Sequence, residues 1–433
     1  MRPAGAHRGT RVAVAATALL IFAAGTGAGG GAWAEGTARV GPDMDPDYRI
    51  SGPEGTSAEW EPAVAWNGTA YLVVWMDERN HDSRLRDIYG RRVSADGSPI
   101  GGDFLISGPG ATANDENPAV AWNGTAYLVV WSDQRTSSSR GADIYGRRVS
   151  AAGAPVGGDF LISGPGATGW DQGPDVVCSG TACLVVWSDE RTSSRGADVY
   201  GRRVSAAGAP VGGDFRISGI GATSDDWTPA VAWDGTEYLV VWSDNRASAI
   251  RGADIYGRRV SSTGSPTGKD FRISGLDALL GQRPAVAWNG TAGEYLVVWQ
   301  DNRNSEDRKQ DIYGRVVLAD GSLPKADFRI SGTRATHDDE SPAVAWSETA
   351  NEYLVVWEDF RNSSKRGADI YGRVVLADGS RPGADFRISG PGATSSDWSP
   401  GVAWNGTDYL VVWQDFRDSG TRGSDIYGRR VGG

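Results

Sequence analysis

The sequence predicts an all-β fold made of seven similar copies. Four phrases recur in the same order about every 56 residues: Pro-Ala-Val-Ala-Trp, Tyr-Leu-Val-Val-Trp, Asp-Ile-Tyr-Gly-Arg and Asp-Phe-Arg-Ile-Ser. A leading proline marks the copies at Pro62, Pro118, Pro174, Pro229, Pro284, Pro342 and Pro400. A period of this length, made of short strands and turns, is typical of a propeller, in which each small sheet needs neighbours to bury its faces. We therefore predict a seven-bladed β-propeller with four antiparallel strands per blade.

The first 34 residues are predicted to be a secretory signal peptide. Arg2, Arg8 and Arg11 precede an apolar stretch from Val12 to Ala24, and Ala32-Trp33-Ala34 matches a cleavage site. The stretch is too short to span a bilayer comfortably, and no other apolar run is long enough. We expect cleavage after Ala34, secretion and no membrane insertion; a retained N-terminal anchor is the alternative.

The mature chain is predicted to be acidic and to form one domain. The whole chain has a formal net charge of -11, and removing residues 1–34 takes away three arginines and no acid. Nucleic acid and anionic membranes are therefore poor partners. Residues 35–46 are a lead-in, and the seven copies occupy nearly all of residues 47–433, which we assign to a single, monomeric propeller domain.

Each copy contains four strand-like runs separated by turns. In the first copy the runs are Pro62 to Trp66, Tyr71 to Trp75, Asp87 to Val93 and Asp103 to Ser107. Asn67-Gly68 predicts a hairpin between the first two runs, and Ala95-Asp96-Gly97 predicts a turn between the last two. The second run is apolar at successive positions, which indicates a strand buried on both faces by stacked blades.

The ring is predicted to close by pairing its two ends. The fourth run follows copies one to six, but the chain stops at Val431-Gly432-Gly433 before a seventh can occur. Asp47-Tyr48-Arg49-Ile50-Ser51 matches the missing run. We expect residues 47–51 to complete the last blade beside Ile426 to Val431, which leaves no free edge.

The fourth run carries an arginine in five places. These are Arg49, Arg216, Arg272, Arg329 and Arg387. A charge at this position suits an outer edge strand that must not pair with other molecules.

The Val-Val-Trp-x-Asp-x-Arg and Asp-Ile-Tyr-Gly-Arg phrases resemble the repeats of seven-bladed β-propellers found in secreted bacterial proteins. The resemblance covers residues 47 to 431. It implies the architecture and an extracellular, bacterial setting, and it brings no assigned activity with it.

Both cysteines fall in the third copy. Cys178 stands where other copies mostly have Trp, and Cys183 stands where they have Tyr. The two positions flank the hairpin loop and face each other across the ladder, so we predict a disulfide in an exported chain.

An Asp-x-Arg pair follows the second run of every copy. The pairs are Asp77 and Arg79, Asp133 and Arg135, Asp189 and Arg191, Asp244 and Arg246, Asp301 and Arg303, Asp359 and Arg361, and Asp415 and Arg417. Because every copy has the pair, we expect a structural network of charge-assisted hydrogen bonds between loops.

A second set of acids stands three residues before the leading proline in six copies. They are Glu59, Asp115, Asp171, Asp226, Asp339 and Asp397, and Gly281 replaces the acid in the fifth copy. These acids should lie near the Asp-x-Arg arginines, because both loops occupy one face of a propeller. They either join the structural network or form an acidic rim that binds calcium or a polyhydroxy ligand. In the fifth copy the arginine should be more mobile or find another partner.

Tryptophans accompany these acids. Trp60, Trp227 and Trp398 stand two residues before a leading proline, and Trp170 stands in the corresponding loop of the third copy. Aromatic planes beside carboxylates suit sugar binding, because the ring stacks on apolar sugar faces. The alternative is that these indoles pack as lids over the blade ends.

No catalytic constellation stands out. We find no nucleophile elbow, and the mature chain has only His81 and His337 as histidines, so we expect neither zinc nor a cofactor. The clearest departures from the repeat are Leu279, Leu280, Gln282 and Arg283, together with His337.

Three functions remain open for the mature chain. The first is a binding or scaffold module that recognises carbohydrate or an extracellular protein through the face that bears the Asp-x-Arg loops. A polysaccharide-degrading hydrolase or lyase is the alternative. A structural cell-surface protein is the third.

Overall fold

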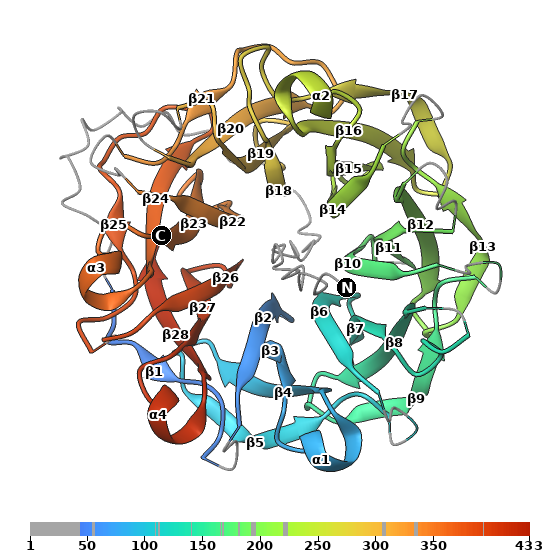
Figure 1. The fold of residues 1–433 in the computed structure, drawn as a ribbon, viewed down its shortest axis with the longest axis vertical. Helices are drawn as coiled ribbons and strands as arrows, with labels where there is room; N and C mark the ends of the chain where they lie inside the picture. Colours follow the sequence, from blue (N-terminus) through green and yellow to red (C-terminus); the bar gives the residue numbers. More distant parts are fainter. Residues whose placement is uncertain are drawn as a thin grey trace, which may run out of the picture.

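Seven four-stranded antiparallel sheets form a ring, as predicted (Figure 1). The computed structural model describes residues 44–433 apart from gaps at 54–56, 109, 111–112, 140, 165, 167–168, 181, 192–195, 220–223, 305–308, 333–336 and 393. The predicted signal peptide and most of the predicted lead-in lie outside the described residues. In each blade we call the strands inner, second, third and outer, counted from the centre of the ring.

The strands follow the sequence order within each blade. Blade 1 contains β2 (Glu59–Trp66), β3 (Ala70–Asp77), β4 (Asp87–Ser94) and β5 (Pro99–Leu105); blade 2 contains β6 (Asp115–Trp122), β7 (Ala126–Asp133), β8 (Asp143–Ser150) and β9 (Pro155–Leu161). Blade 3 contains β10 (Asp171–Cys178), β11 (Ala182–Asp189), β12 (Asp198–Ser205) and β13 (Pro210–Arg216); blade 4 contains β14 (Asp226–Trp233), β15 (Glu237–Asp244), β16 (Asp254–Ser261) and β17 (Pro266–Arg272). Blade 5 contains β18 (Gln282–Asn289), β19 (Glu294–Asp301), β20 (Asp311–Leu318) and β21 (Phe328–Arg329); blade 6 contains β22 (Asp339–Ser347), β23 (Glu352–Asp359), β24 (Asp369–Leu376) and β25 (Phe386–Arg387). Blade 7 contains β26 (Asp397–Trp404), β27 (Asp408–Asp415), β28 (Asp425–Gly432) and, as its outer strand, β1 (Tyr48–Arg49).

The amino-terminal strand closes the ring. Tyr48 pairs with Gly428 and Arg49 with Tyr427 in an antiparallel ladder. The backbone N–H of Ile50 then donates to the carbonyl of Ile426 (2.7 Å), and the Ile50 side chain is fully buried. The predicted completion of the last blade by the N-terminal segment is therefore confirmed.

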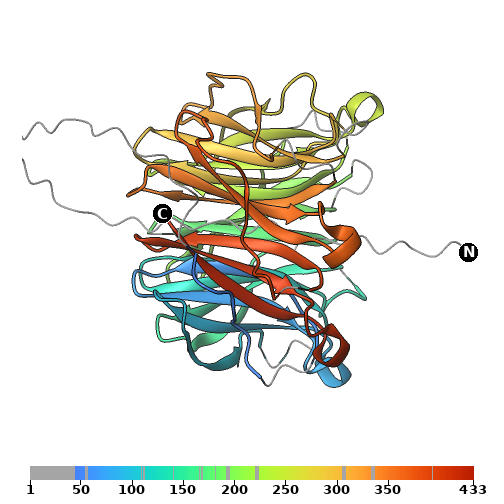
Figure 2. The same ribbon diagram turned by 90° about the vertical axis from the view of Figure 1, so that its left-hand side faces the viewer.

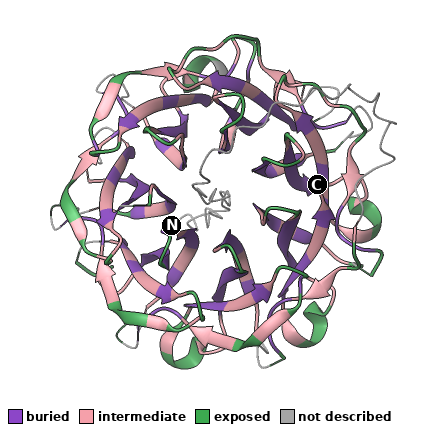
Figure 3. Cartoon of the chain, turned by 180° about the vertical axis from the view of Figure 1, so that it is seen from behind, coloured by how far each residue is buried: buried purple, intermediate pink, exposed green. Residues whose placement is uncertain are grey.

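The core lies in the seams between blades. The tryptophan of each second strand is fully buried. Val64 and Val73 of blade 1 belong to one apolar cluster with Leu410 and Val412 of blade 7, and the other seams are built alike. Buried residues dominate the inner and second strands, the third strands mix buried and intermediate residues, and exposed residues gather on loops and outer strands (Figure 3). Each sheet is thus covered on both faces by its neighbours.

Four short helices mark one face of the ring. They are α1 (His81–Arg84), α2 (Ser248–Arg251), α3 (Ser363–Arg366) and α4 (Ser419–Arg422), each in the loop between a second and a third strand. Seen edge-on, all four lie on the same side (Figure 2), which we call the helix face. No helix among the described residues has the length and apolar character needed to cross a bilayer.

The outer strands differ from the prediction in length. They have seven residues in blades 1–4 and two in blades 5–7. In blade 1 the strand begins at Pro99 rather than Asp103, because Pro99 and Ile100 pair with Val93 and Arg92 directly after the turn. A bulge between the Arg92–Ile100 and Gly90–Phe104 pairs then sets the register of Phe104, a phenylalanine that recurs in copies two to six.

The outer-strand arginines are also used differently from the prediction. Arg49 Nη2 lies 2.7 Å from Asp425 Oδ1, and Arg216 Nη2 lies 2.5 Å from Asp198 Oδ1. These arginines turn inward to the aspartate that begins the third strand, so their charge is neutralised within the blade instead of guarding its edge.

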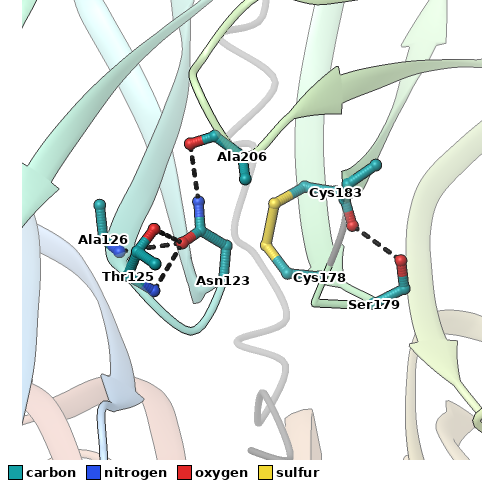
Figure 4. The surroundings of a disulfide bond; sticks show 8 residues. Asn123, Thr125, Ala126, Cys178, Ser179, Cys183 and Ala206 are labelled. Carbon is teal, nitrogen blue, oxygen red and sulfur yellow. Dashed lines mark hydrogen bonds between the residues drawn. A yellow bond between two sulfur atoms is a disulfide. The ribbon is translucent and has the colours of Figure 1, made fainter.

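A disulfide joins Cys178 and Cys183, as predicted (Figure 4). The two residues are paired directly across the inner hairpin of blade 3. In the other six blades a tryptophan and a tyrosine contact each other at this place, for example Trp66 and Tyr71 with ring centroids 4.6 Å apart. The covalent bond therefore replaces an aromatic contact.

Deleting residues up to Ser51 should open the ring. We expect the free energy of unfolding to fall by at least about 3 kcal/mol, because the buried Ile50 and the β1 ladder are lost. Denaturant unfolding of this variant, beside a control chain that begins at Met44, measures the effect. Equal midpoints for the two chains would contradict closure by β1.

Candidate functional site

The Asp-x-Arg pairs form a repeated network on the helix face. Arg79 Nη2 donates to Asp77 Oδ2 (2.6 Å) and to Asp103 Oδ2 (2.9 Å) of the outer strand. Its guanidinium also lies 4.1 Å from the centre of the Tyr89 ring, at cation–π distance. The same arrangement is made by Asp133, Arg135 and Tyr145; Asp189, Arg191 and Tyr200; Asp244, Arg246 and Tyr256; Asp301, Arg303 and Tyr313; Asp359, Arg361 and Tyr371; and Asp415, Arg417 and Tyr427.

This network also connects neighbouring blades. The N–H of Gly52, which follows the outer strand of blade 7, donates to both carboxylate oxygens of Asp103 in blade 1 (3.0 and 2.9 Å). A Cβ atom at Gly52 would lie 2.9 Å from Asp103 Oδ2, so a side chain here would crowd the carboxylate. The arginine therefore fixes the outer-strand aspartate, and that aspartate binds the backbone of the preceding blade.

The acids before the leading prolines face the Asp-x-Arg aspartates across the sheet, and in blade 1 Glu59 Oε1 also lies 3.6 Å from Arg79 Nη2. Asp115 faces Asp133 in register across the inner and second strands, and Asp171 faces Asp189. The same pairing holds for Glu59 with Asp77, Asp226 with Asp244, Asp339 with Asp359, and Asp397 with Asp415. All these carboxyl groups are buried, so a polymer on the helix face would not contact them.

Their ionisation is strongly perturbed. Burial, and then the negative charge of the facing aspartate, raise the pKa of Asp115, Asp171, Asp226, Asp339 and Asp397. Burial likewise raises the pKa of Glu59 to about 8. These six groups therefore favour the protonated form at neutral pH.

Blade 5 has Gly281 at this position and a different arrangement. Arg303 Nη1 donates to Asp277 Oδ1 (3.1 Å), an exposed acid from the preceding loop. The N–H of Leu279 donates to Asp301 Oδ1 (3.3 Å). The arginine thus has a further partner where the inner acid is missing.

Two of the four candidate tryptophans come together. Trp398 and Trp60 both contact Phe416 edge-on, with ring centroids 4.7 and 6.0 Å apart. This aromatic pair spans the seam between blades 7 and 1. Trp227 belongs to blade 4, and Trp170, beside blade 3, is exposed.

A ring of bulges surrounds the centre near the helix face. Each inner strand shifts register just before its leading proline, and the residue there has a left-handed backbone. The residues are Glu61, Asn117, Gly173, Thr228, Arg283, Ser341 and Ser399. Neighbours touch across the seams: Asn117 Nδ2 donates to Glu61 Oε2 (2.7 Å), and Arg283 Nη1 donates to Ser341 Oγ (2.6 Å). Strained backbone at a variable position within constant repeats is typical of a functional surface.

Beside this bulge ring, blade 6 carries a pair of glutamates. Glu340 of the inner strand is directly opposite Glu358 of the second strand. The equivalent pairs are Trp60 and Met76, Glu116 and Ser132, Gln172 and Ser188, Trp227 and Ser243, Gln282 and Gln300, and Trp398 and Gln414. Among these seven pairs, all within the described residues, blade 6 alone has two acids.

The two glutamates have different environments. Glu358 is 4% exposed and accepts a hydrogen bond from the N–H of Ser399 at Oε1 (2.8 Å). Burial raises the pKa of Glu358 to about 7, against the opposing effect of Arg283. Glu340 is more open to solvent, and its Oε2 lies 3.7 Å from Arg283 Nη1. A protonated acid beside a second carboxyl and a guanidinium can perform general acid–base chemistry.

Glu340 and Glu358 were not among the site residues predicted from the sequence, whereas Arg283 was one of the departures from the repeat. The sequence does contain a signal for Glu358. Position x of Val-Val-Trp-x-Asp is Met, Ser or Gln in every copy except the sixth, where it is Glu. Within the described residues, no group of three or more His, Cys, Asp or Glu side chains is placed to hold a metal ion.

Removing one network arginine should destabilise the ring. We expect Arg135→Met to lower the free energy of unfolding by about 3 kcal/mol, because the buried Asp133 and its neighbour Asp159 lose their common counter-charge. Denaturant unfolding measures the change. The exposed Lys365→Met is the matched control and should be neutral; a comparable loss there would refute the structural role.

Solved structures share this fold. One is Penicillium chrysogenum α-L-arabinanase complexed with arabinobiose, with a TM-score of 0.50 and 13% identity, covering 90% of this chain and 98% of that chain. Another is an α-L-arabinofuranosidase from Fusarium graminearum in complex with an iminosugar inhibitor, with a TM-score of 0.50 and 13% identity, covering 75% of this chain and 96% of that chain. At such identity the likeness shows the propeller fold alone. No family model matches the chain, and no curated protein matches its sequence.

Proposed function

We propose that this propeller hydrolyses glycosidic bonds of a polysaccharide bound across the helix face. The observation that carries the proposal is the in-register pair of Glu340 and Glu358, the one place where the repeat has two acids with contrasting environments. Glycoside hydrolysis needs two carboxyl groups, of which one gives a proton to the leaving oxygen and the other acts as base or nucleophile.

The different surroundings of Glu358 and Glu340 indicate which one is the acid and which one is the base or nucleophile. Glu358 is buried and keeps its proton near neutral pH, so it is the general acid. Burial raises the pKa of Glu340 as well, but Glu340 is more open to solvent than Glu358, and the Arg283 guanidinium 3.7 Å away opposes the shift and favours the ionised form. Glu340 is therefore the second carboxylate.

The aromatic pair supplies a surface for sugar rings. Trp398 precedes Ser399, whose N–H is held by Glu358, so Trp398 stands next to the acid pair along the strand. Trp60 shares the Phe416 contact with it. Indole planes beside carboxyl groups suit stacking on apolar sugar faces.

The two structural neighbours suggest the first polymer to test. One is an arabinanase seen with arabinobiose and the other an arabinofuranosidase. Arabinan is therefore the first candidate substrate. The predicted signal peptide and the Cys178–Cys183 bond support an extracellular setting, where such polymers occur.

Binding without turnover is the second candidate function. The Trp60, Trp398 and Phe416 cluster favours it, because the stacking surface requires no acid. Carbohydrate is the preferred ligand in this case, with an extracellular protein as the alternative partner.

Replacing the acid should abolish hydrolysis and leave the fold intact. We expect Glu358→Gln to lower kcat on arabinan at least about 100-fold, measured as reducing ends released. Gln300 makes the equivalent bond in blade 5, where its Oε1 accepts from the N–H of Ser341 (3.0 Å), so the variant should melt normally. Glu116→Gln, in the blade 2 copy of the Glu340 position, is the control. Full activity of Glu358→Gln would exclude Glu358 as the general acid. If the wild-type protein binds arabinan without hydrolysing it, the binding function replaces the hydrolase.

The activity should also depend on pH in one direction. Because Glu358 must be protonated, kcat/KM is expected to fall as the pH rises through about 7, the pKa of Glu358. A pH profile on arabinan measures this fall. A rate that rises across the same interval would contradict Glu358 as the acid.

A further inference from the structure

We propose that in six of the seven blades one proton is shared between the inner-strand acid and the facing second-strand aspartate, and that these shared protons hold adjacent blades together. The six groups are Glu59, Asp115, Asp171, Asp226, Asp339 and Asp397, and we call each with its facing aspartate a carboxyl pair. None of these groups takes part in the proposed hydrolysis.

The pair in blade 3 shows why a proton is needed. Asp189 accepts the N–H and the Nε–H of Arg191 (2.8 Å each) and the Nε1–H of Trp187 (3.2 Å). It is therefore held as a carboxylate. Asp171 is fully buried, and neither of its oxygens receives a hydrogen bond from any donor among the described residues. An ionised, dry carboxylate without a donor would cost several kcal/mol.

A proton removes this conflict. A protonated carboxyl group is itself a donor, and the facing carboxylate is an acceptor. The bond formed is charge-assisted and therefore strong. Both oxygens of Asp226, Asp339 and Asp397 are buried as well and receive no hydrogen bond from a donor in the described part of the chain, so four blades have the same unsatisfied acid.

Among the described residues, the charged groups that act on Asp171 are Asp189 and Arg191. Asp189 faces it from β11, and Arg191 is occupied by Asp189 and by Asp214 of the outer strand. From blade 2, Ser163 approaches it, and Ser163 contacts Asp143 (3.4 Å). Burial and the Asp189 charge accordingly raise the pKa of Asp171, and Arg191 only partly offsets them.

Each carboxyl pair stands at a seam between blades. Asp171 belongs to blade 3, whereas Ser163 follows the outer strand of blade 2. At the closing seam, Glu59 Oε2 accepts the N–H of Ile426 (3.1 Å) of blade 7, and Ser424 Oγ donates to the Glu59 carbonyl (2.6 Å). Gly281 leaves one seam without a pair.

The raised pKa values make the free energy of unfolding depend on pH. In the unfolded chain these acids titrate near pH 4, whereas their folded pKa values are raised. Folding therefore takes up protons at neutral pH. The stabilisation is complete in acid, decreases as the pH rises above about 4, and is lost as the pH passes the folded pKa values.

The number of protons released on unfolding tests the proposal. Calorimetric unfolding of residues 35–433 at pH 7, in buffers with different ionisation enthalpies, gives that number directly. We expect about one proton per carboxyl pair. Asp171→Asn keeps a donor facing Asp189, so it should fold and release about one proton fewer. Asp277→Asn, the exposed acid of blade 5, is the matched control and should release the same number as the wild type.

Infrared spectroscopy of the unmodified protein gives a second readout that does not depend on a variant folding. The C=O stretch of buried carboxylic acids should be present at pH 7 and disappear in strong alkali. Absence of this band, together with no proton release, would overturn the proposal. Calcium is the other way to satisfy facing carboxylates. A rise in Tm with calcium at pH 7 that is lost in Asp171→Asn would also overturn it.

Discussion

The ring exists because each blade is apolar on both faces. A strand such as β3 is buried along all eight residues, so its sheet needs a neighbour on each side. In a closed ring the first and last blades cover each other, so no apolar face stays exposed. The pairing of β1 with β28 completes the last blade and therefore the ring. The buried Ile50 then fills the last seam as the equivalent isoleucines fill the others.

The polar groups of the helix face complete each seam. The arginine of Asp-x-Arg binds one acid of its own loop and one of the outer strand, and the outer acid binds the backbone of the previous blade. Behind this network lies the inner acid, facing an aspartate that the arginine already neutralises. One positive charge therefore serves two ionised acids, and the third acid is left to carry a proton. This charge count, at the six seams that have an inner acid, explains why a buried acidic cluster does not push the blades apart.

The proposed active site lies where the copies differ from one another. The scaffold positions are nearly identical in all copies, whereas the bulge ring differs from blade to blade. Glu340, Glu358 and Arg283 come together there because the bulge of blade 5 reaches toward blade 6, and the N–H of the blade 7 bulge binds Glu358. The same capping bond is made by Gln300 in blade 5, so glutamate in blade 6 adds an ionisable group without changing the packing.

Local patterns in the sequence determined the architecture: the period, the strand types, the closing segment and the Cys178–Cys183 bond follow from spacing and turn chemistry alone. Tertiary structure decided which side chains meet across strands. A one-residue bulge before each leading proline changes the register, so it places Asp171 against Asp189 and Glu340 against Glu358. The tertiary structure also brings Arg49 into an ion pair with Asp425 inside blade 7, although the two residues are far apart in the chain. Cross-strand contacts and burial depend on register and on neighbouring blades, and these determine pKa values and hence chemistry.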